Sequence, residues 1–316
     1  MGFDREHFSG IRESKRMRQA NGSDEKHFLG IVASKRMRQA NYPEGLHELI
    51  DKFPHVLRNY TLLVTGGTFD DVFSKGGRKP LETGKKAWEK YVRKEYKGQF
   101  KGEVLRFGKD GGLIQLSERV RDPNINTGVV IFLIDPQDVG EIFPEIQELF
   151  RMCAVSNIIL LITYCSASLW ASNEALGAQN EIDAAKPNDT LAVISHNKKK
   201  LDMCLFIVKH RDKLAFFKRI ITTGTTGNWV EKFLDLFPNV SPKVDKKKSG
   251  PVGGDVMISN EILEKKCQHV CFFFDPDTAH PHEADIYALF RTCTFSDVNV
   301  NLRITCKAAE SWIETI

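Results

Sequence analysis

The chain has 316 residues, of which 41% are hydrophobic and 27% are charged, so it holds enough apolar side chains for sizeable cores and is long enough for two domains. This composition excludes a chain that is disordered along its whole length, a fibrous repeat and a small disulfide scaffold. The 45 basic and 41 acidic residues leave a net charge of +4, which is too small to indicate binding to nucleic acid.

The cysteines and the apolar runs indicate the cellular compartment in which the protein is expected. There are seven cysteines, and most of them lie in or beside apolar runs, a pattern typical of buried free thiols in a reducing environment. Residues 1–10 carry charges and have no apolar core of the kind found in signal peptides. The longest apolar runs are much shorter than a membrane span. We therefore expect a soluble cytoplasmic protein with no membrane partner.

A short repeat opens the chain. Residues 7–21 and 27–41 differ at only three positions. The second copy contains an apolar run, 29–33, that predicts a buried strand, whereas the same strand in the first copy would bury Arg12 and Glu13 at a high cost. We therefore expect residues 1–26 to form a basic tail outside the core. A disordered extension, an exposed helix and a partner-binding arm all remain open for it.

A longer repeat relates the two halves of the chain. Residues 135–151 and 275–291 have the same length, and each follows an apolar run and leads through an amphipathic helix to another apolar run. Strands that alternate with helices predict α/β domains with a parallel sheet. A polar segment, 183–189, separates the halves. The sequence predicts two tandem three-layer αβα domains, 27–187 and 188–316, each with a mainly parallel Rossmann-like sheet.

Four segments of the second half follow or flank predicted strands, where parallel sheets present their ligands. They are 196–200 after the strand 191–195, 223–228 after the strand 219–222, 249–255 before a helix over 256–265, and 275–285 after the run 270–274. The Gly/Thr segment 223–228 would precede a helix over 229–237 and offer N–H groups to an anion. Taken singly, each segment could be a tight turn, a helix cap or a solvated lysine run.

Taken together, these residues make the second half resemble methylglyoxal synthase from Leu191 to about Trp312. The same fold occurs in the regulatory domain of carbamoyl phosphate synthetase and in inosine monophosphate cyclohydrolase, but the Gly-Gly-Asp and Pro-His elements favour the synthase. The resemblance implies a lyase that takes a proton from dihydroxyacetone phosphate and eliminates phosphate to give methylglyoxal. It implies no metal and no organic cofactor, a small phosphorylated metabolite as partner, a homo-oligomeric assembly and no nucleic acid.

The resemblance also assigns site residues. The catalytic set is Asp255, His282, His196, Asp285 and Asp275, and the set that holds substrate and phosphate is Lys200, Thr223, Gly224, Thr225, Thr226, Gly227, Ser249 and Gly250. The chemistry of Asp255 fits independently, because a carboxylate at a helix N-terminus stays ionised and can act as a base. The two histidines suit donation to an enediolate oxygen. Asp275 could equally well orient its loop.

Two departures bear on activity. Asn197 stands where synthases usually have Asp, and an amide cannot carry charge or protons. The sequence ends at Ile316, without the C-terminal arginine that the family uses to bind phosphate in a neighbouring subunit. Asn197 removes one carboxylate from the site but keeps its shape and hydrogen bonding, whereas the loss of the arginine would weaken substrate binding and leave the base in place.

The first half differs from the second at the corresponding positions. We expect its domain to keep the fold and to have lost the lyase site, because Asp70 and Asp71 follow its Gly/Thr segment and would repel an anion, and Leu113 replaces the base. The other counterparts are Ser34 for His196, Ile142 for His282 and Glu145 for Asp285. The first half also contains an insert, 75–101, that is rich in Lys and Gly.

Three functions fit this sequence. The first is a tandem synthase with its active site in the second domain. The second is a non-catalytic protein of the same fold that senses a phosphorylated metabolite or a nucleotide. The third is a pseudoenzyme whose surface binds another protein. The retained Asp255, His282 and Lys200 favour the first.

Overall fold

The structure is a computed structural model, and it describes residues 27–79, 81–135, 144–176, 188–235, 242–278, 282–295, 297–298 and 300–316. The predicted tail 1–26 and Ile142 lie outside the described residues. None of the described helices is long and apolar enough to cross a membrane.

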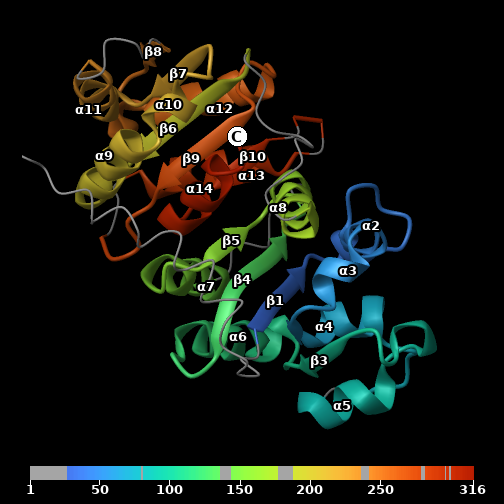
Figure 1. Cartoon of the computed structure of the whole chain (residues 1–316). Coiled ribbons are helices and arrows are strands. Elements are labelled where there is room, and N and C mark those ends of the chain that lie inside the picture. Colours follow the sequence, from blue (N-terminus) through green and yellow to red (C-terminus); the bar gives the residue numbers. More distant parts are fainter. Residues whose placement is uncertain are drawn as a thin grey trace, which may run out of the picture.

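The N-terminal half, residues 27–176, is built around one five-stranded sheet with the strand order β3-β2-β1-β4-β5 (Figure 1). Its strands are β1 (His27–Ala33), β2 (Thr61–Val64), β3 (Lys101–Val104), β4 (Asn126–Leu133) and β5 (Ile159–Leu161). Its helical segments are η2 (Arg36–Arg38), α2 (Leu46–Lys52), α3 (Pro54–Leu57), α4 (Gly66–Thr68), η3 (Phe69–Phe73), α5 (Gly84–Tyr91), η4 (Lys94–Tyr96), η5 (Gly108–Asp110), α6 (Gly112–Arg121), α7 (Pro144–Val155) and α8 (Tyr164–Leu176).

The C-terminal half, residues 188–316, repeats this plan with a sheet of order β10-β9-β6-β7-β8 (Figure 1). Its strands are β6 (Thr190–Ser195), β7 (Arg219–Thr222), β8 (Lys243–Lys246), β9 (His269–Phe273) and β10 (Asn301–Arg303). Its helical segments are η6 (Asn197–Lys199), α9 (Lys200–Lys209), α10 (Arg211–Leu214), α11 (Gly224–Leu234), η7 (Gly250–Val252), α12 (Gly254–Leu263), α13 (Glu283–Cys293) and α14 (Cys306–Ile313).

The predicted fold class is confirmed. All described strand pairs within the two sheets are parallel, and helices flank both sheets. The central strands are runs of apolar residues; every residue of β6, for example, is buried, because helices cover both faces of its sheet. Some boundaries differ from prediction. The helix α11 begins at Gly224, five residues before Trp229, so the Gly/Thr segment lies at the start of the helix. The helix α12 begins at Gly254, two residues earlier than predicted.

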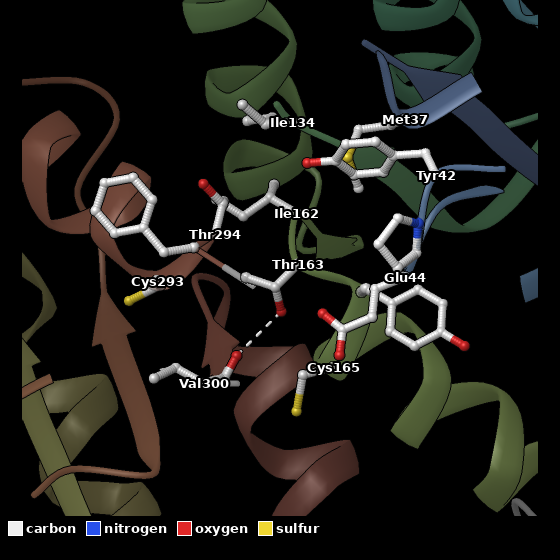
Figure 2. Close-up of a pocket in the computed structure, with 13 residues that line it drawn as sticks. Met37, Tyr42, Glu44, Ile134, Ile162, Thr163, Cys165, Cys293, Thr294 and Val300 are labelled. Atoms are coloured by element: carbon white, nitrogen blue, oxygen red, sulfur yellow. Dashed lines mark hydrogen bonds between the residues drawn. The ribbon is translucent and has the colours of Figure 1, made fainter. Parts of the chain in front are cut away.

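The two halves pack together along corresponding edges of their sheets. Ser166 at the start of α8 accepts a hydrogen bond from the N–H of Leu302 in β10 (2.8 Å), and Thr163 donates to the carbonyl oxygen of Val300 (3.1 Å) (Figure 2). Phe150 of α7 packs against Phe290 of α13 within an apolar core to which both halves contribute. The cavity at this junction has a volume of only about 20 Å³, which holds little more than one water molecule. The junction is therefore closely packed.

The lysine-rich insert supplies a helix that covers the N-terminal sheet. Trp88 of α5 is 3% exposed and packs against Phe69 and Phe73 of η3. Gly102 of β3 lies directly beneath the Trp88 ring, where a Cβ atom would collide with the indole. The insert is therefore part of the core of its half, although its composition is that of a solvated loop.

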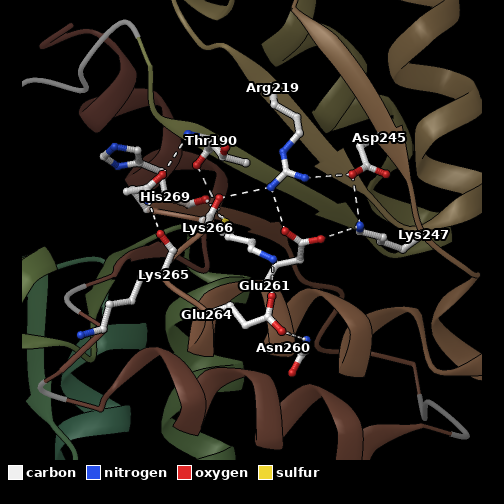
Figure 3. A network of polar contacts seen from close by, with 12 residues as sticks. Thr190, Arg219, Asp245, Lys247, Asn260, Glu261, Glu264, Lys265, Lys266 and His269 are labelled. Atoms are coloured by element: carbon white, nitrogen blue, oxygen red, sulfur yellow. Dashed lines mark hydrogen bonds and ion pairs between the residues drawn. The ribbon is translucent and has the colours of Figure 1, made fainter.

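A network of charged side chains ties α12 to the edge of the C-terminal sheet (Figure 3). Glu261 of α12 accepts hydrogen bonds from Arg219 of β7 (2.8 Å) and from Lys247 (2.7 Å). Asp245 of β8 accepts from the same two cations, at 3.0 and 3.1 Å. Because α12 follows the turn that contains Ser249 and Gly250, the network fixes this turn and the helix relative to the sheet.

This network gives a testable dependence of stability on pH. Burial by itself would raise the pKa of Glu261, but hydrogen bonds from Lys247 and Arg219 outweigh it and lower the pKa. A carboxylate whose pKa is lowered by folding stabilises the protein above its unfolded pKa, and this stabilisation is lost as the pH falls through the folded pKa. Glu261→Gln should therefore lower the free energy of unfolding by about 1–2 kcal/mol at pH 7. Denaturant titrations of both proteins should show this difference shrinking below about pH 4; a difference independent of pH would contradict the assignment.

Candidate active site

A cavity of about 560 Å³ opens at the carboxyl ends of the central strands of the C-terminal sheet. Its lining combines two histidines, two carboxylates, hydroxyls and one lysine. Eight of the predicted site residues line it: His196, Thr223, Thr225, Ser249, Gly250, Asp255, Asp275 and His282. The other five, Lys200, Gly224, Thr226, Gly227 and Asp285, are not among the residues that line it.

The two glycines before Asp255 allow the turn that brings this carboxylate into the cavity. Gly253 has a φ of +84°, a left-handed conformation that L side chains rarely adopt. Gly254 lies against the carbonyl oxygen of Lys248, where a Cβ atom would have no room. The turn places Asp255 in the first helical turn of α12, where its side chain is 1% exposed.

The Asp255 carboxylate is buried beside His282. Neither of its oxygens accepts a hydrogen bond from the part of the chain that the structure describes, and its Oδ2 lies 3.4 Å from Nε2 of His282. Burial raises the pKa of Asp255, His282 lowers it, and Asp285 raises it again, with a net upward shift. A buried carboxylate without donors is costly. Such an arrangement is typical of a site that uses the group chemically.

His196 is held in a defined orientation opposite this carboxylate. Its Nδ1 accepts a hydrogen bond from the N–H of Asp275 (2.9 Å). Because Nδ1 accepts, a neutral His196 carries its proton on Nε2. The centroids of the His196 and His282 rings lie 6.3 Å apart. The structure therefore brings Asp255, His282 and His196 together around one cavity.

The two remaining carboxylates occupy different positions. Asp275 is 4% exposed, and its Oδ1 accepts the N–H of Asp277 (3.1 Å), so it orients the loop that it begins. Asp285 lies in the first turn of α13, where its N–H donates to the carbonyl oxygen of His282 (3.0 Å). Asp285 acts on the cavity through the pKa of Asp255.

The Gly/Thr segment forms the side of the cavity suited to an anion. Thr223 occupies the N-cap position of α11, where its hydroxyl donates to Oγ1 of Thr226 (3.0 Å) and makes no capping hydrogen bond. The N–H groups of Thr225 and Thr226 lie in the first turn, where the helix supplies no acceptor. The N–H of Gly224 is different, because it donates to the carbonyl oxygen of Lys248 (3.1 Å). Gly224 therefore joins the two loops of the site, and the expectation that its N–H holds phosphate needs this correction.

We call the part of the cavity wall formed by Thr223, Thr225 and Ser249 the anion slot. Lys200 lies beneath it. Its Nζ donates to the carbonyl oxygen of Ser195 and to Oγ1 of Thr226, both at 2.8 Å. Burial lowers the pKa of Lys200 to about 8, so the ammonium is still mostly protonated at pH 7. It places a positive charge under the slot and holds Thr226 in place.

The C-terminal half contains two short lysine runs, Lys198–Lys200 and Lys246–Lys248, and their members lie in different environments. Lys199, Lys246 and Lys247 are paired with the carboxylates of Asp202, Glu231 and Glu261, respectively. Lys198 and Lys248 form no ion pair with the described residues, and both are exposed. Only Lys198 of these two lines the cavity. Lys198 follows His196 by two residues in the sequence, and this short separation was the signal that could have identified it.

The N-terminal half carries the counterparts of these features without their chemistry. Ser34 accepts the N–H of Asp135 (2.8 Å), as His196 accepts that of Asp275. Gly111 has a φ of +90°, and Gly112 lies against the carbonyl oxygen of Arg106, so the Gly-Gly turn is repeated. At the position of Asp255 this turn presents Leu113, which is buried. Glu145, the counterpart of Asp285, lies in the first turn of α7.

The predicted repulsion by Asp70 and Asp71 needs a correction. Asp70 accepts two hydrogen bonds from Arg78 (2.6 and 3.2 Å), and Asp71 pairs with Arg38 (3.3 Å). The Arg78 side chain is 1% exposed and stacks on Phe107. The guanidinium group of Arg78 lies close to Gly66, and that of Arg38 lies close to Gly67. The counterpart of the anion slot is therefore filled by the half's own arginines, whose charges the aspartates balance. These partners are distant in sequence, so the pairing could not be predicted.

Comparisons with known proteins agree with this geometry. The family described as "MGS-like domain" matches residues 203–301. Methylglyoxal synthase of Clostridium beijerinckii is 41% identical over 120 residues, which make up 38% of this chain and 93% of that protein. The synthase of Thermus thermophilus is 38% identical over 125 residues, 39% of this chain and 93% of that protein.

One solved structure is also similar to part of the chain. The match to the crystal structure of methylglyoxal synthase from Elizabethkingia anophelis has 31% sequence identity and a TM-score of 0.35, and it covers 42% of this chain and 82% of that chain. The family match at residues 203–301 lies in the C-terminal half, and the relatives are covered over nearly their whole length. The chain therefore belongs, through its C-terminal half, to the methylglyoxal synthase family.

Proposed function

We propose that the C-terminal half is a lyase that converts dihydroxyacetone phosphate to methylglyoxal and phosphate. The observation that carries this proposal is the buried Asp255 carboxylate, which faces His282 in a cavity whose other side is an anion slot. The family relationship supports the same reaction. No metal or organic cofactor enters the proposal.

In the proposed reaction Asp255 takes a proton from the hydroxymethyl carbon, which lies on the side of the carbonyl group away from the phosphate, and an enediolate forms. Burial raises the pKa of Asp255, which makes its ionised form a stronger base than an exposed carboxylate. His196 donates from Nε2 and His282 shuttles a proton to the enediolate oxygens. The bond between carbon and the bridging oxygen of the phosphate then breaks, and its electron pair leaves with the phosphate. The enol that remains takes up a proton on carbon and becomes methylglyoxal.

The departing phosphate would be held by the slot. Thr223, Thr225 and Ser249 supply hydroxyls, and the first turn of α11 supplies N–H groups and the positive end of its dipole. Lys200 adds its charge from beneath through Thr226. Gly250 leaves the space between the slot and the carboxylate open, because a Cβ atom there would lie 2.7 Å from Nε2 of His282.

Lys198 should supply a further cation to the substrate phosphate. Lys198→Met should raise the KM for dihydroxyacetone phosphate about fivefold, since a charge at the cavity mouth contributes about 1 kcal/mol to anion binding. Lys248→Met is the matched control, because Lys248 is also exposed and forms no ion pair with the described residues but does not line the cavity. Steady-state kinetics of both variants test this. Equal changes in KM would mean that only the net charge of the protein matters.

For the N-terminal half, we propose a second copy of the same domain that has lost the lyase site. The boundaries of the two domains would be 27–187 and 188–316. Leu113 in place of Asp255, Ser34 in place of His196 and the arginine-filled slot support this. The buried or half-buried thiols of the described residues fit a reducing cytoplasm, and assembly into homo-oligomers remains our expectation.

A sensor of phosphorylated metabolites is the second candidate function. One observation favours it: Asn197, which cannot carry the charge of the usual aspartate, lines the cavity. The test is to incubate the purified full chain with dihydroxyacetone phosphate and to measure methylglyoxal and phosphate. Release of both in equal amounts supports the lyase, whereas binding of phosphate or nucleotide without turnover would select the sensor.

A further inference from the structure

One wall of the cavity is the loop that follows β9, and it is held by a short chain of hydrogen bonds. The N–H of Asp275 donates to His196, and the N–H of Asp277 donates to the carboxylate of Asp275. Thr278, one residue further, lines the cavity. The position of Asp277 therefore affects both the Asp275 carboxylate and the cavity wall.

A residue of the N-terminal half contacts this loop. Nη1 of Arg151, in α7, donates to Oδ1 of Asp277 at 3.1 Å. The contact is the only salt bridge between the described residues of the two halves, and both side chains are about half exposed, at 48% and 59%. Packing next to this contact holds Arg151 in position, because Phe150, the neighbour of Arg151, packs on Phe290 of the C-terminal half.

The salt bridge between Arg151 and Asp277 also neutralises a negative charge near the cavity. The cavity contains the carboxylates of Asp255 and Asp275, and its proposed ligand is an anion. Without a partner, Asp277 would add a negative charge near the cavity mouth and would weaken anion binding. Arg151 balances this charge and does not itself line the cavity.

We propose that Arg151 is a positioning residue for the C-terminal site, through which the N-terminal half holds the Asp275–Thr278 loop. It acts through Asp277 and touches neither the substrate nor the reacting groups. The inference rests on the proposed lyase function for its kinetic readout, whereas its binding readout, the affinity for inorganic phosphate, does not depend on turnover.

The experiment compares four proteins of full length: wild type, Arg151→Ala, Asp277→Ala and the double variant. Arg151→Ala should raise both the KM for dihydroxyacetone phosphate and the Kd for inorganic phosphate about three- to fivefold, the effect of one partly exposed ion pair. The kcat should change less than about twofold. In the Asp277→Ala background, Arg151→Ala should change neither constant, because its partner is already absent.

Two further variants separate positioning from general stability. Arg151→Lys keeps the charge and should stay within about twofold of wild type in both constants. Arg119→Ala removes a comparable ion pair, with Glu103 at 2.8 Å, that lies wholly within the N-terminal half; it should change neither constant.

The outcomes distinguish this inference from the proposed function. Phosphate binding that weakens in Arg151→Ala, in a protein that does not turn over dihydroxyacetone phosphate, supports the inference and contradicts the lyase. Turnover with unchanged KM and phosphate Kd in Arg151→Ala overturns the inference and leaves the lyase standing. An equal effect of Arg151→Ala in the Asp277→Ala background, or an equal effect of Arg119→Ala, also overturns it.

Discussion

Asp255→Asn is expected to lower kcat for dihydroxyacetone phosphate by about 10²–10⁴-fold, the contribution of a general base, and at the same time to stabilise the protein. The gain in stability follows from the environment of the carboxylate, which is buried and accepts no hydrogen bond from the described residues. Because folding raises the pKa of Asp255, the ionised group destabilises the folded state once the pH exceeds its unfolded pKa.

The two effects together separate a catalytic role from a structural one. A carboxylate that supported the fold would lower the melting temperature when replaced. Asp245→Asn is the matched comparison, because Asp245 accepts hydrogen bonds from Arg219 and Lys247 and should lose stability. Measurements of activity and of melting temperature for both variants distinguish the catalytic role from the structural one. A destabilised Asp255→Asn that retains turnover would remove Asp255 from the mechanism.

Gly254→Ala should disturb the site through the backbone. Its new Cβ atom would collide with the carbonyl oxygen of Lys248, so α12 and the turn that contains Ser249 must move apart. Overpacking of this kind costs about 1–3 kcal/mol of stability, and a shift of about 1 Å in a catalytic group lowers the rate about 10²-fold. We therefore expect a loss of kcat much larger than the change in stability explains.

The N-terminal half provides the control for this change. Gly112 lies against the carbonyl oxygen of Arg106 in the same way, but its turn leads to Leu113 in place of a carboxylate. Gly112→Ala should therefore lower the stability by a similar amount and leave kcat near the wild-type value. Equal losses of kcat in the two variants would show that the activity depends on general stability.

The sequence predicted the fold class and eight of the residues that line the cavity. Short apolar runs predicted the central strands because parallel strands are buried on both faces, and β7 begins and ends where the prediction placed it. Asp255, His196 and His282 lie around one cavity because each follows or flanks a strand whose carboxyl end meets the others at one edge of the sheet.

Contacts between distant residues could not be predicted. The sequence could not show that Asp70 is paired with Arg78 of the insert, because two adjacent carboxylates by themselves indicate repulsion. Nor could it divide the lysine runs into paired and unpaired members, since Lys247 finds Glu261 only when α12 packs against the sheet. The start of α11 was placed too late because Gly and Thr have low helix propensity, which the N-terminal turn tolerates.

The central claim is that the C-terminal half carries out the lyase reaction in a chain whose N-terminal half has lost the site. The most direct measurement is the release of methylglyoxal and phosphate from dihydroxyacetone phosphate by the purified full chain, with Asp255→Asn in parallel. We predict equal amounts of both products from the wild type and a rate at least about 10²-fold lower from the variant. No products from a folded wild-type protein, or equal rates from both proteins, would contradict the claim.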